Sequence, residues 1–214
     1  MRRSTRFRDR VDAGRRLGER LAEYRGRPDV IVLGLPRGGV PVAAQVAAAL
    51  RCPLDVLVVR KVGVPGHEEL AMGAVGPGTT VLNGDLIARL RLDAATVDDA
   101  VRRAREEMQH KELTFRDGRR APDLANRTVI VVDDGLATGA TMTAAVQVLG
   151  QHSATAVIAA APVGARDTVA RLAAMAEVAG VVCVVVPDDF AAVGYWYDDF
   201  TQTTDSEVLE LLAR

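Results

Sequence analysis

Five short runs along the chain are almost wholly apolar, and each fits a strand that is buried on both faces. Stretches with helical spacing of apolar residues separate them. Strands alternating with helices imply parallel crossovers, so the sequence predicts an α/β fold: a doubly wound, mostly parallel sheet of about five strands flanked by helices. The expected strands are Val30–Leu33, Val56–Val59, Thr128–Val132, Ala154–Ala160 and Val181–Val186, and three of the helices are Pro41–Leu50, Gly139–Leu149 and Asp167–Ala176.

Two further helices are expected outside this alternation. Asp9–Tyr24 is amphipathic, because Ala13, Leu17 and Leu21 repeat every four residues. Ala95–Phe115 is long and strongly charged, with few apolar positions, so we expect it to lie over the edge of the core.

Glycine and proline are dense from Val62 to Gly84. This composition predicts a mobile loop containing at most one short hairpin. Asn83 is a suitable cap for a short helix that ends near Leu90.

We expect a single domain over residues 1–214, since the chain shows neither an internal repeat nor a long linker. Its core would cover about 27–186. A flexible lid would cover about 62–80, and a small C-terminal hood about 187–204.

The charge balance does not alter the predicted fold, but it bears on the partners of the protein. The chain has 27 basic and 28 acidic residues, which argues against nucleic acid as an obligatory partner. Two groups of arginines are expected to be solvated, the first on a frayed terminus. They are Arg2, Arg3, Arg6, Arg8 and Arg10, and Arg102, Arg103 and Arg105.

Other features bear on the compartment. Cys52 and Cys183 are far apart and show no metal-ligand or redox spacing, so buried free thiols are expected. No apolar run is long enough to span a bilayer, and no hydrophobic segment follows the N-terminal arginines. We therefore expect a cytoplasmic protein without a membrane partner.

The clearest candidate site follows the strand Thr128–Val132. The acidic pair Asp133-Asp134 comes first, and we expect both carboxylates at the solvated rim, because burying them is costly. A run of small residues then opens a helix: Gly135, Ala137, Thr138, Gly139, Ala140 and Thr141. Free amides at a helix start and two hydroxyls can hold a phosphate, while the acids can accept hydrogen bonds from ribose hydroxyls. A plain strand-to-helix turn capped by aspartate is the alternative.

A second glycine-rich turn lies between the first strand and its helix. In Gly34–Val40, Gly38 and Gly39 expose backbone amides, and Arg37 offers a guanidinium suited to a diphosphate. A third group, Arg60-Lys61, follows the second strand; two solvated charges are the alternative reading there.

Residues Val129–Met142 resemble the phosphoribosyl pyrophosphate signature of type I phosphoribosyltransferases, and the likeness extends from about Arg27 to Phe200. The resemblance implies binding of 5-phosphoribosyl 1-pyrophosphate (PRPP) with Mg²⁺. Asp133 and Asp134 would hold the ribose hydroxyls, and Ala137, Thr138, Gly139, Ala140 and Thr141 the 5′-phosphate. Arg37, Gly38, Gly39, Arg60 and Lys61 would bind pyrophosphate, with Arg37, Asp133 and Asp134 as the catalytic residues.

The same resemblance suggests a cis peptide at Pro36–Arg37. It implies that Val62–Gly76 closes over pyrophosphate as a lid. The C-terminal aromatic segment is similar to the hood of hypoxanthine-guanine enzymes, so Phe190 would face a base and Asp198 would lie near the magnesium, directly or through water. One extra residue between Phe190 and Gly194 leaves the register of that segment open.

The signature departs from the hypoxanthine-guanine type at Ala137, where those enzymes carry an aspartate thought to assist proton transfer; the adenine enzymes are closer here. The general base is therefore unassigned. Glu68 and Glu69 are candidates, although solvated loop charges are the simpler interpretation.

The expected function is transfer of phosphoribose from PRPP to an unidentified acceptor, such as a purine base, with release of pyrophosphate. A homodimer is common in the resembling family. The alternative is a non-catalytic sensor of PRPP or a nucleotide on the same fold. A dinucleotide-binding domain is excluded, because no Gly-x-Gly-x-x-Gly follows the first strand.

Overall fold

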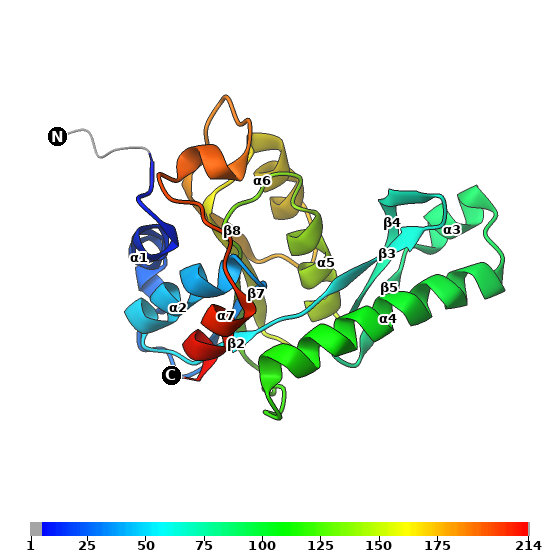
Figure 1. Ribbon diagram of the computed structural model, residues 1–214, viewed down its shortest axis with the longest axis horizontal. Coiled ribbons are helices and arrows are strands. Elements are labelled where there is room, and N and C mark those ends of the chain that lie inside the picture. Colours follow the sequence, from blue (N-terminus) through cyan, green and yellow to red (C-terminus); the bar gives the residue numbers. More distant parts are fainter. Residues whose placement is uncertain (1–5, 214) are drawn as a thin grey trace.

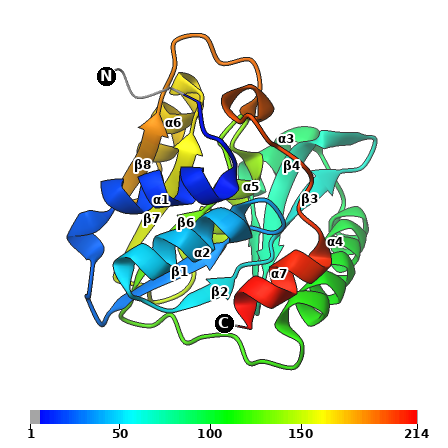
Figure 2. The same ribbon diagram turned by 60° about the vertical axis from the view of Figure 1, so that its left-hand side comes forward.

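A five-stranded parallel sheet forms the centre of the molecule. The computed structural model describes residues 6–213. The strands lie in the order β2-β1-β6-β7-β8, and every neighbouring pair is parallel, as expected (Figure 2). Their bounds are β1 Val30–Gly34, β2 Leu54–Val56, β6 Thr128–Val132, β7 Ala156–Val163 and β8 Gly180–Val185.

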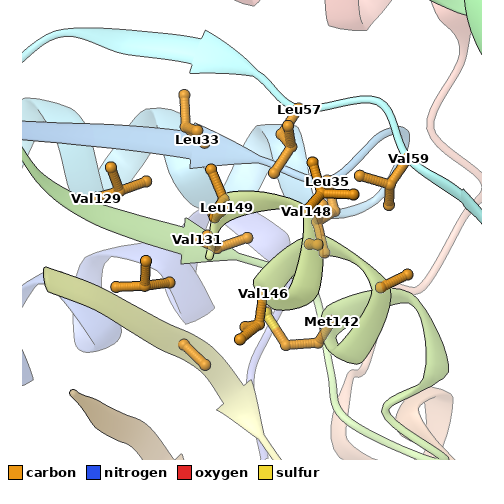
Figure 3. Packing of buried hydrophobic residues seen from close by; sticks show 14 of the residues in the cluster. Leu33, Leu35, Leu57, Val59, Val129, Val131, Met142, Val146, Val148 and Leu149 are labelled. Carbon is orange, nitrogen blue, oxygen red and sulfur yellow. The ribbon is translucent and has the colours of Figure 1, made fainter. Parts of the chain in front are cut away.

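Helices cover both faces of this sheet, and alternating strand residues decide which helices they meet. Val30, Val32, Ile130 and Val132 pack toward α1 (Arg10–Arg20) and α2 (Gly39–Leu50), which lie in front of the sheet in Figure 2. On the opposite face the intervening residues pack against α5 (Ala140–Leu149). Figure 3 shows Leu33, Val129 and Val131 beside Val146 and Leu149. The α6 helix (Arg166–Ala173) completes this second layer.

The segment that was expected to be a mobile loop is instead an antiparallel sheet, and that expectation was wrong. It consists of β3 (Arg60–Val64), β4 (His67–Gly76) and β5 (Thr79–Leu82). Glycine here serves close approach, since a Cβ added at Gly73 would lie 2.2 Å from the carbonyl oxygen of Val81. This glycine-rich segment therefore forms hydrogen-bonded strands, although its composition is typical of a loop.

This correction moves Arg60 and Lys61 as well. The strand expected at Val56–Val59 occupies Leu54–Val56, so the basic pair begins β3 and does not end β2. In Figure 1 the antiparallel sheet, α3 (Gly84–Leu90) and part of α4 (Ala94–Arg116) extend away from the parallel sheet. Asn83 caps α3 as predicted, accepting a hydrogen bond from the Leu86 amide.

The buried guanidinium of Arg116 connects the end of α4 to β2 of the parallel sheet. Arg116 bonds Asp55 at 3.1 Å, Glu112 at 2.8 Å and the carbonyl oxygen of Val56 at 3.2 Å. Moving α4 away would leave this buried charge without its partners, which is strongly destabilising. The long helix therefore crosses the edge of the core at a defined position.

The helix α7 (Asp205–Leu212), which packs against α4, was not predicted from the sequence. Thr204 and Glu207 form a capping box at its start, a spacing that is readable in the sequence. Over residues 6–213 there are also two short 3₁₀ helices, η1 at Ala22–Tyr24 and η2 at Val193–Trp196.

The remaining predicted elements agree with the structure to within a few residues. Asp9 caps α1 and does not belong to it, because its side chain accepts from the Asp12 amide. The two cysteines are free and half-buried, and no helix within residues 6–213 is long and apolar enough to cross a membrane.

Candidate phosphoribosyl site

Two loops meet where β1 and β6 end. Gly34 and Val132 are paired across these strands, so the segments that follow them leave the same edge of the sheet. A Cβ at Gly38 would lie 1.9 Å from Oδ2 of Asp134, and a Cβ at Gly39 would lie 2.5 Å from the carbonyl oxygen of Val132. Only glycine permits this contact between the predicted pyrophosphate loop and the predicted ribose acids.

The acidic pair is far less exposed than we expected. The side chain of Asp134 is 17% exposed, and Oδ1 of Asp133 accepts from the Asp134 amide at 2.9 Å. Burial raises the pKa of Asp133, and the adjacent Asp134 raises it further. Burial also raises the pKa of Asp134, against the lowering effect of Arg10. The expectation of two carboxylates at a solvated rim was therefore wrong.

Arg10 is the partner of this pair, and its expected place on a frayed, solvated terminus was also wrong. From α1, its Nε and Nη2 donate to Oδ2 of Asp134 at 3.0 and 2.8 Å. Nη1 donates to the Thr201 carbonyl oxygen at 2.7 Å, and the guanidinium lies 4.1 Å from the centre of the Phe200 ring. The expected solvation of Arg2 and Arg3 lies outside the described residues.

The loop after the acids is braced from α6. Gly139, which caps α5, has φ +69°, and a Cβ there would lie 2.4 Å from Cγ2 of Thr168. Thr168 donates to the carbonyl oxygen of Ala137 at 2.6 Å, and Arg171 donates to that of Thr138 at 2.5 Å. These two hydrogen bonds fix the loop on its α6 side. On the other side Ala137, Thr138 and Thr141 are exposed at the start of α5, where a phosphate can bind.

The predicted pyrophosphate-binding cations gather beside this loop. The Pro36–Arg37 peptide is cis, as the resemblance suggested. Arg37 lies 3.6 Å from Asp205, and Arg60 lies 3.8 Å from Glu107. A cavity of about 130 Å³ adjoins Pro36, Arg60, Lys61 and Thr141, together with Leu57, Val59 and Ala144.

A larger cleft of about 430 Å³ lies between the antiparallel sheet and α5. Its lining includes Lys61 of β3, Thr138 and Ala140 of the predicted phosphate loop, and Arg171 of α6. The antiparallel sheet thus forms one wall beside the candidate site, where the sequence analysis expected a lid.

The C-terminal segment contributes a residue that sequence reasoning did not single out. The hydroxyl of Tyr197 donates to the carbonyl oxygen of Asp134 at 2.6 Å, and its ring is buried 5.4 Å from that of Phe7. Phe190 is half-buried against the same aromatic cluster. Asp198 is 60% exposed and lies 3.3 Å from Arg6.

The donor set suits a magnesium ion that the substrate helps to hold. Within the part of the chain that the structure describes, no group of three or more His, Cys, Asp or Glu side chains could hold a metal. Mg²⁺ commonly binds through one or two carboxylates with substrate phosphates and waters. The buried pair Asp133 and Asp134 fits that arrangement, since a nearby cation would favour its ionised form.

Comparison with known proteins agrees with this geometry. Residues 6–198 match the phosphoribosyl transferase domain. The chain is 52% identical over 209 residues to a Mycobacterium tuberculosis (strain H37Rv) protein that is named provisionally as a phosphoribosyl transferase. The match covers 97% of this chain and 46% of the relative, so the chain spans about half of that protein's length.

A solved structure is similar over nearly the whole chain. The crystal structure of TT1426 from Thermus thermophilus has a TM-score of 0.88 and 44% identity, covering 97% of each chain. The chain belongs to the phosphoribosyl transferase domain family. The fold and the recognition of the signature at Val129–Met142 are thereby confirmed.

Proposed function

We propose that the protein is a phosphoribosyltransferase that binds PRPP with Mg²⁺ at the meeting of the two loops and transfers phosphoribose to an acceptor. One observation carries this proposal: glycines 38 and 39 lie directly against the acidic pair Asp133-Asp134. A ribose held by the acids would therefore have its anomeric diphosphate beside Arg37. PRPP carries its ribose and its diphosphate on adjacent atoms, so the two binding loops must lie this close together.

Each part of PRPP has a proposed binding element. The carboxylates of Asp133 and Asp134 accept hydrogen bonds from the ribose 2′ and 3′ hydroxyls. The loop Ala137–Thr141 binds the 5′-phosphate with backbone amides and the hydroxyls of Thr138 and Thr141. Arg37, Arg60 and Lys61, with the amides of Gly38 and Gly39, bind the pyrophosphate.

The reaction breaks the bond between the anomeric carbon and the pyrophosphate oxygen, and a bond to the acceptor forms there. Positive charge develops on the ribose ring in the transition state, and the nearby acids stabilise it. A bound Mg²⁺ would supply positive charge against the leaving pyrophosphate. Asp198 is a further candidate ligand of the magnesium beside Asp133 and Asp134, and Phe190 is a candidate to face a nucleobase acceptor. Purines are one class of acceptor to test.

The antiparallel sheet from β3 to β5 is proposed as the cover of the site, in the role that we first assigned to a loop. It adjoins the cleft that reaches the phosphate loop. Excluding water protects a reactive sugar cation from hydrolysis.

Calorimetric titration with PRPP and Mg²⁺ tests the proposal. The wild type should bind, and the double variant Asp133→Asn, Asp134→Asn should lose most of that affinity. A screen of purines, pyrimidines and other acceptors for pyrophosphate release then tests transfer. Binding without turnover on any acceptor would support the alternative, a sensor of PRPP or a nucleotide. An absence of PRPP binding would contradict both.

A further inference from the structure

A basic cluster beside the two loops is larger than the sequence suggested, and α4 contributes to it. The cluster comprises Arg37, Arg60, Lys61 and Lys111. Arg37 leaves the end of β1, and Arg60 and Lys61 begin β3. Lys111 comes from α4, to which the sequence analysis assigned no functional residue.

Helix geometry places Lys111 on the side of α4 that faces β3. Glu107 lies one turn before Lys111, and Oε2 of Glu107 is 3.8 Å from Nε of Arg60. Met108 and Phe115, three residues before and four after Lys111, are both buried. Lys111, which is exposed, therefore lies at the edge of the packed stripe, on the side of α4 where Glu107 meets Arg60.

The electrostatics of Lys111 agree with this position. Partial burial lowers its pKa, and the positive charges of Arg60 and Arg37 lower it further. Asp205 and Glu107 act in the opposite direction, but they do not cancel the effect. The charge of Lys111 thus interacts with both arginines that are proposed to bind pyrophosphate.

The local acids leave the cluster with an excess of positive charge. Among the side chains that the structure describes, Glu107 and Asp205 alone pair with its arginines, at 3.8 and 3.6 Å, and they are 69% and 55% exposed. Exposed pairs at such separations contribute little. The Nε of Arg60 is buried and makes no hydrogen bond, a cost that an anion's oxygen could remove.

Composition adds an independent observation. Among 27 basic residues the chain has only two lysines, Lys61 and Lys111, and the remaining 25 are arginines. Both lysines lie in this cluster. An ammonium group is a compact charge that can approach a phosphate end-on, where a planar guanidinium requires more space.

We propose that Lys111 of α4 binds the terminal phosphate of the diphosphate group together with Arg37 and Arg60. Glu107 and Asp205 pair only weakly with the two arginines, so both guanidiniums stay available to the anion. This inference rests on the proposed function, and it assigns part of the pyrophosphate site to a helix outside the parallel sheet.

The test compares two probes, pyrophosphate with Mg²⁺ and ribose 5-phosphate, by calorimetry. Lys111→Gln should weaken pyrophosphate binding about tenfold, as expected for the loss of one charge-assisted contact. It should leave ribose 5-phosphate binding unchanged. Glu107→Gln should strengthen pyrophosphate binding, because a competing acid is removed. Arg102→Gln, on the exposed face of the same helix, is the matched control and should change neither affinity.

A second measurement does not depend on a loss of affinity. With lysine labelled at Cε with ¹³C, the protein gives two lysine signals by NMR, which Lys61→Arg and Lys111→Arg assign. Pyrophosphate should shift the Lys111 signal and raise the pKa of that amine.

The inference is overturned if the Lys111 signal does not respond to pyrophosphate, or if Lys111→Gln weakens both probes equally. In either case PRPP binding by the wild type would leave the proposed function standing. A wild type that binds neither probe nor PRPP would overturn both proposals.

Discussion

Arg10 of the first helix forms an ion pair with Asp134, 124 residues further along the chain, at 2.8 Å. Their side chains are 12% and 17% exposed, so the pair is largely removed from water. The guanidinium also holds the Thr201 carbonyl, and Tyr197 holds the carbonyl oxygen of Asp134. Asp134, the second of the proposed ribose-binding acids, is thus positioned by both ends of the described chain.

Arg10→Gln should lower the free energy of unfolding by about 3 to 5 kcal/mol at neutral pH, since it leaves a buried carboxylate without its partner. The loss should shrink in acid, where Asp134 is protonated. Urea denaturation at several pH values measures this. In a double-mutant cycle, Asp134→Asn should recover much of the loss; equal losses with and without Asp134 would contradict the pairing.

Asp133→Asn should stabilise the free protein while impairing PRPP binding. The folded state raises the pKa of Asp133 above its ordinary value, so this acid favours folding below the unfolded pKa and loses that contribution as pH rises toward the folded pKa. The gain from asparagine should therefore grow from about pH 4 upward. The asparagine Oδ1 can keep the contact with the Asp134 amide.

Thermal unfolding across pH 4 to 9 measures that gain, and Asp29→Asn is a control of opposite sign. Hydrogen bonds from Arg27 and Thr128 lower the pKa of Asp29 to about 2, so its contribution is present above the unfolded pKa and is lost in acid. Asp29→Asn should destabilise the protein at neutral pH. If Asp133→Asn also destabilises the protein at neutral pH, Asp133 does not carry the destabilising buried charge that is inferred here.

Gly38→Ala should reduce kcat/KM for PRPP by about a hundredfold, because a Cβ would meet Oδ2 of Asp134 and displace the loop by a large fraction of an ångström. The control is Gly84→Ala at the start of α3, where a Cβ meets no atom within 4 Å. Steady-state kinetics compare the two variants, or PRPP affinity if no acceptor is found. Similar behaviour of both would exclude the close contact as a functional constraint.

Thr168→Val should raise the KM for PRPP, because the carbonyl oxygen of Ala137 loses the hydroxyl that holds it at 2.6 Å. We expect stability to fall by about 1 to 3 kcal/mol, the cost of an unmade hydrogen bond in a buried setting. Thr114→Val on α4 also removes a hydroxyl bonded to a backbone carbonyl, 3.0 Å away, but far from the loop in sequence. A KM that rises equally in both variants would count against a brace.

The parallel sheet and the signature were predictable because their causes are local. Thr128–Val132 is an unbroken buried strand, and the small residues after it have few other uses at a strand end. The cap at Asn83 also agreed with a short sequence pattern, whereas the cis peptide at Pro36–Arg37 was expected from the family resemblance.

The parts that could not be predicted depend on partners distant in sequence. Nothing near Arg10 indicates Asp134, so a basic N-terminal segment suggested only solvated charge. Burial of the acids follows from the packing of Arg10, Gly38 and Tyr197 around them. In the antiparallel sheet, Gly73 permits close strand contact, a role that composition cannot distinguish from a turn.

The contacts that surround Asp134 also have a consequence for folding kinetics. The amide of Phe7 bonds the Trp196 carbonyl and the amide of Asp198 bonds the Phe7 carbonyl, so some 190 residues separate the partners. Closing so long a loop is entropically costly until the intervening sheet exists. We therefore expect the parallel sheet to fold first and these end-to-end contacts to form late, so that folding intermediates would contain the sheet before a competent ribose site.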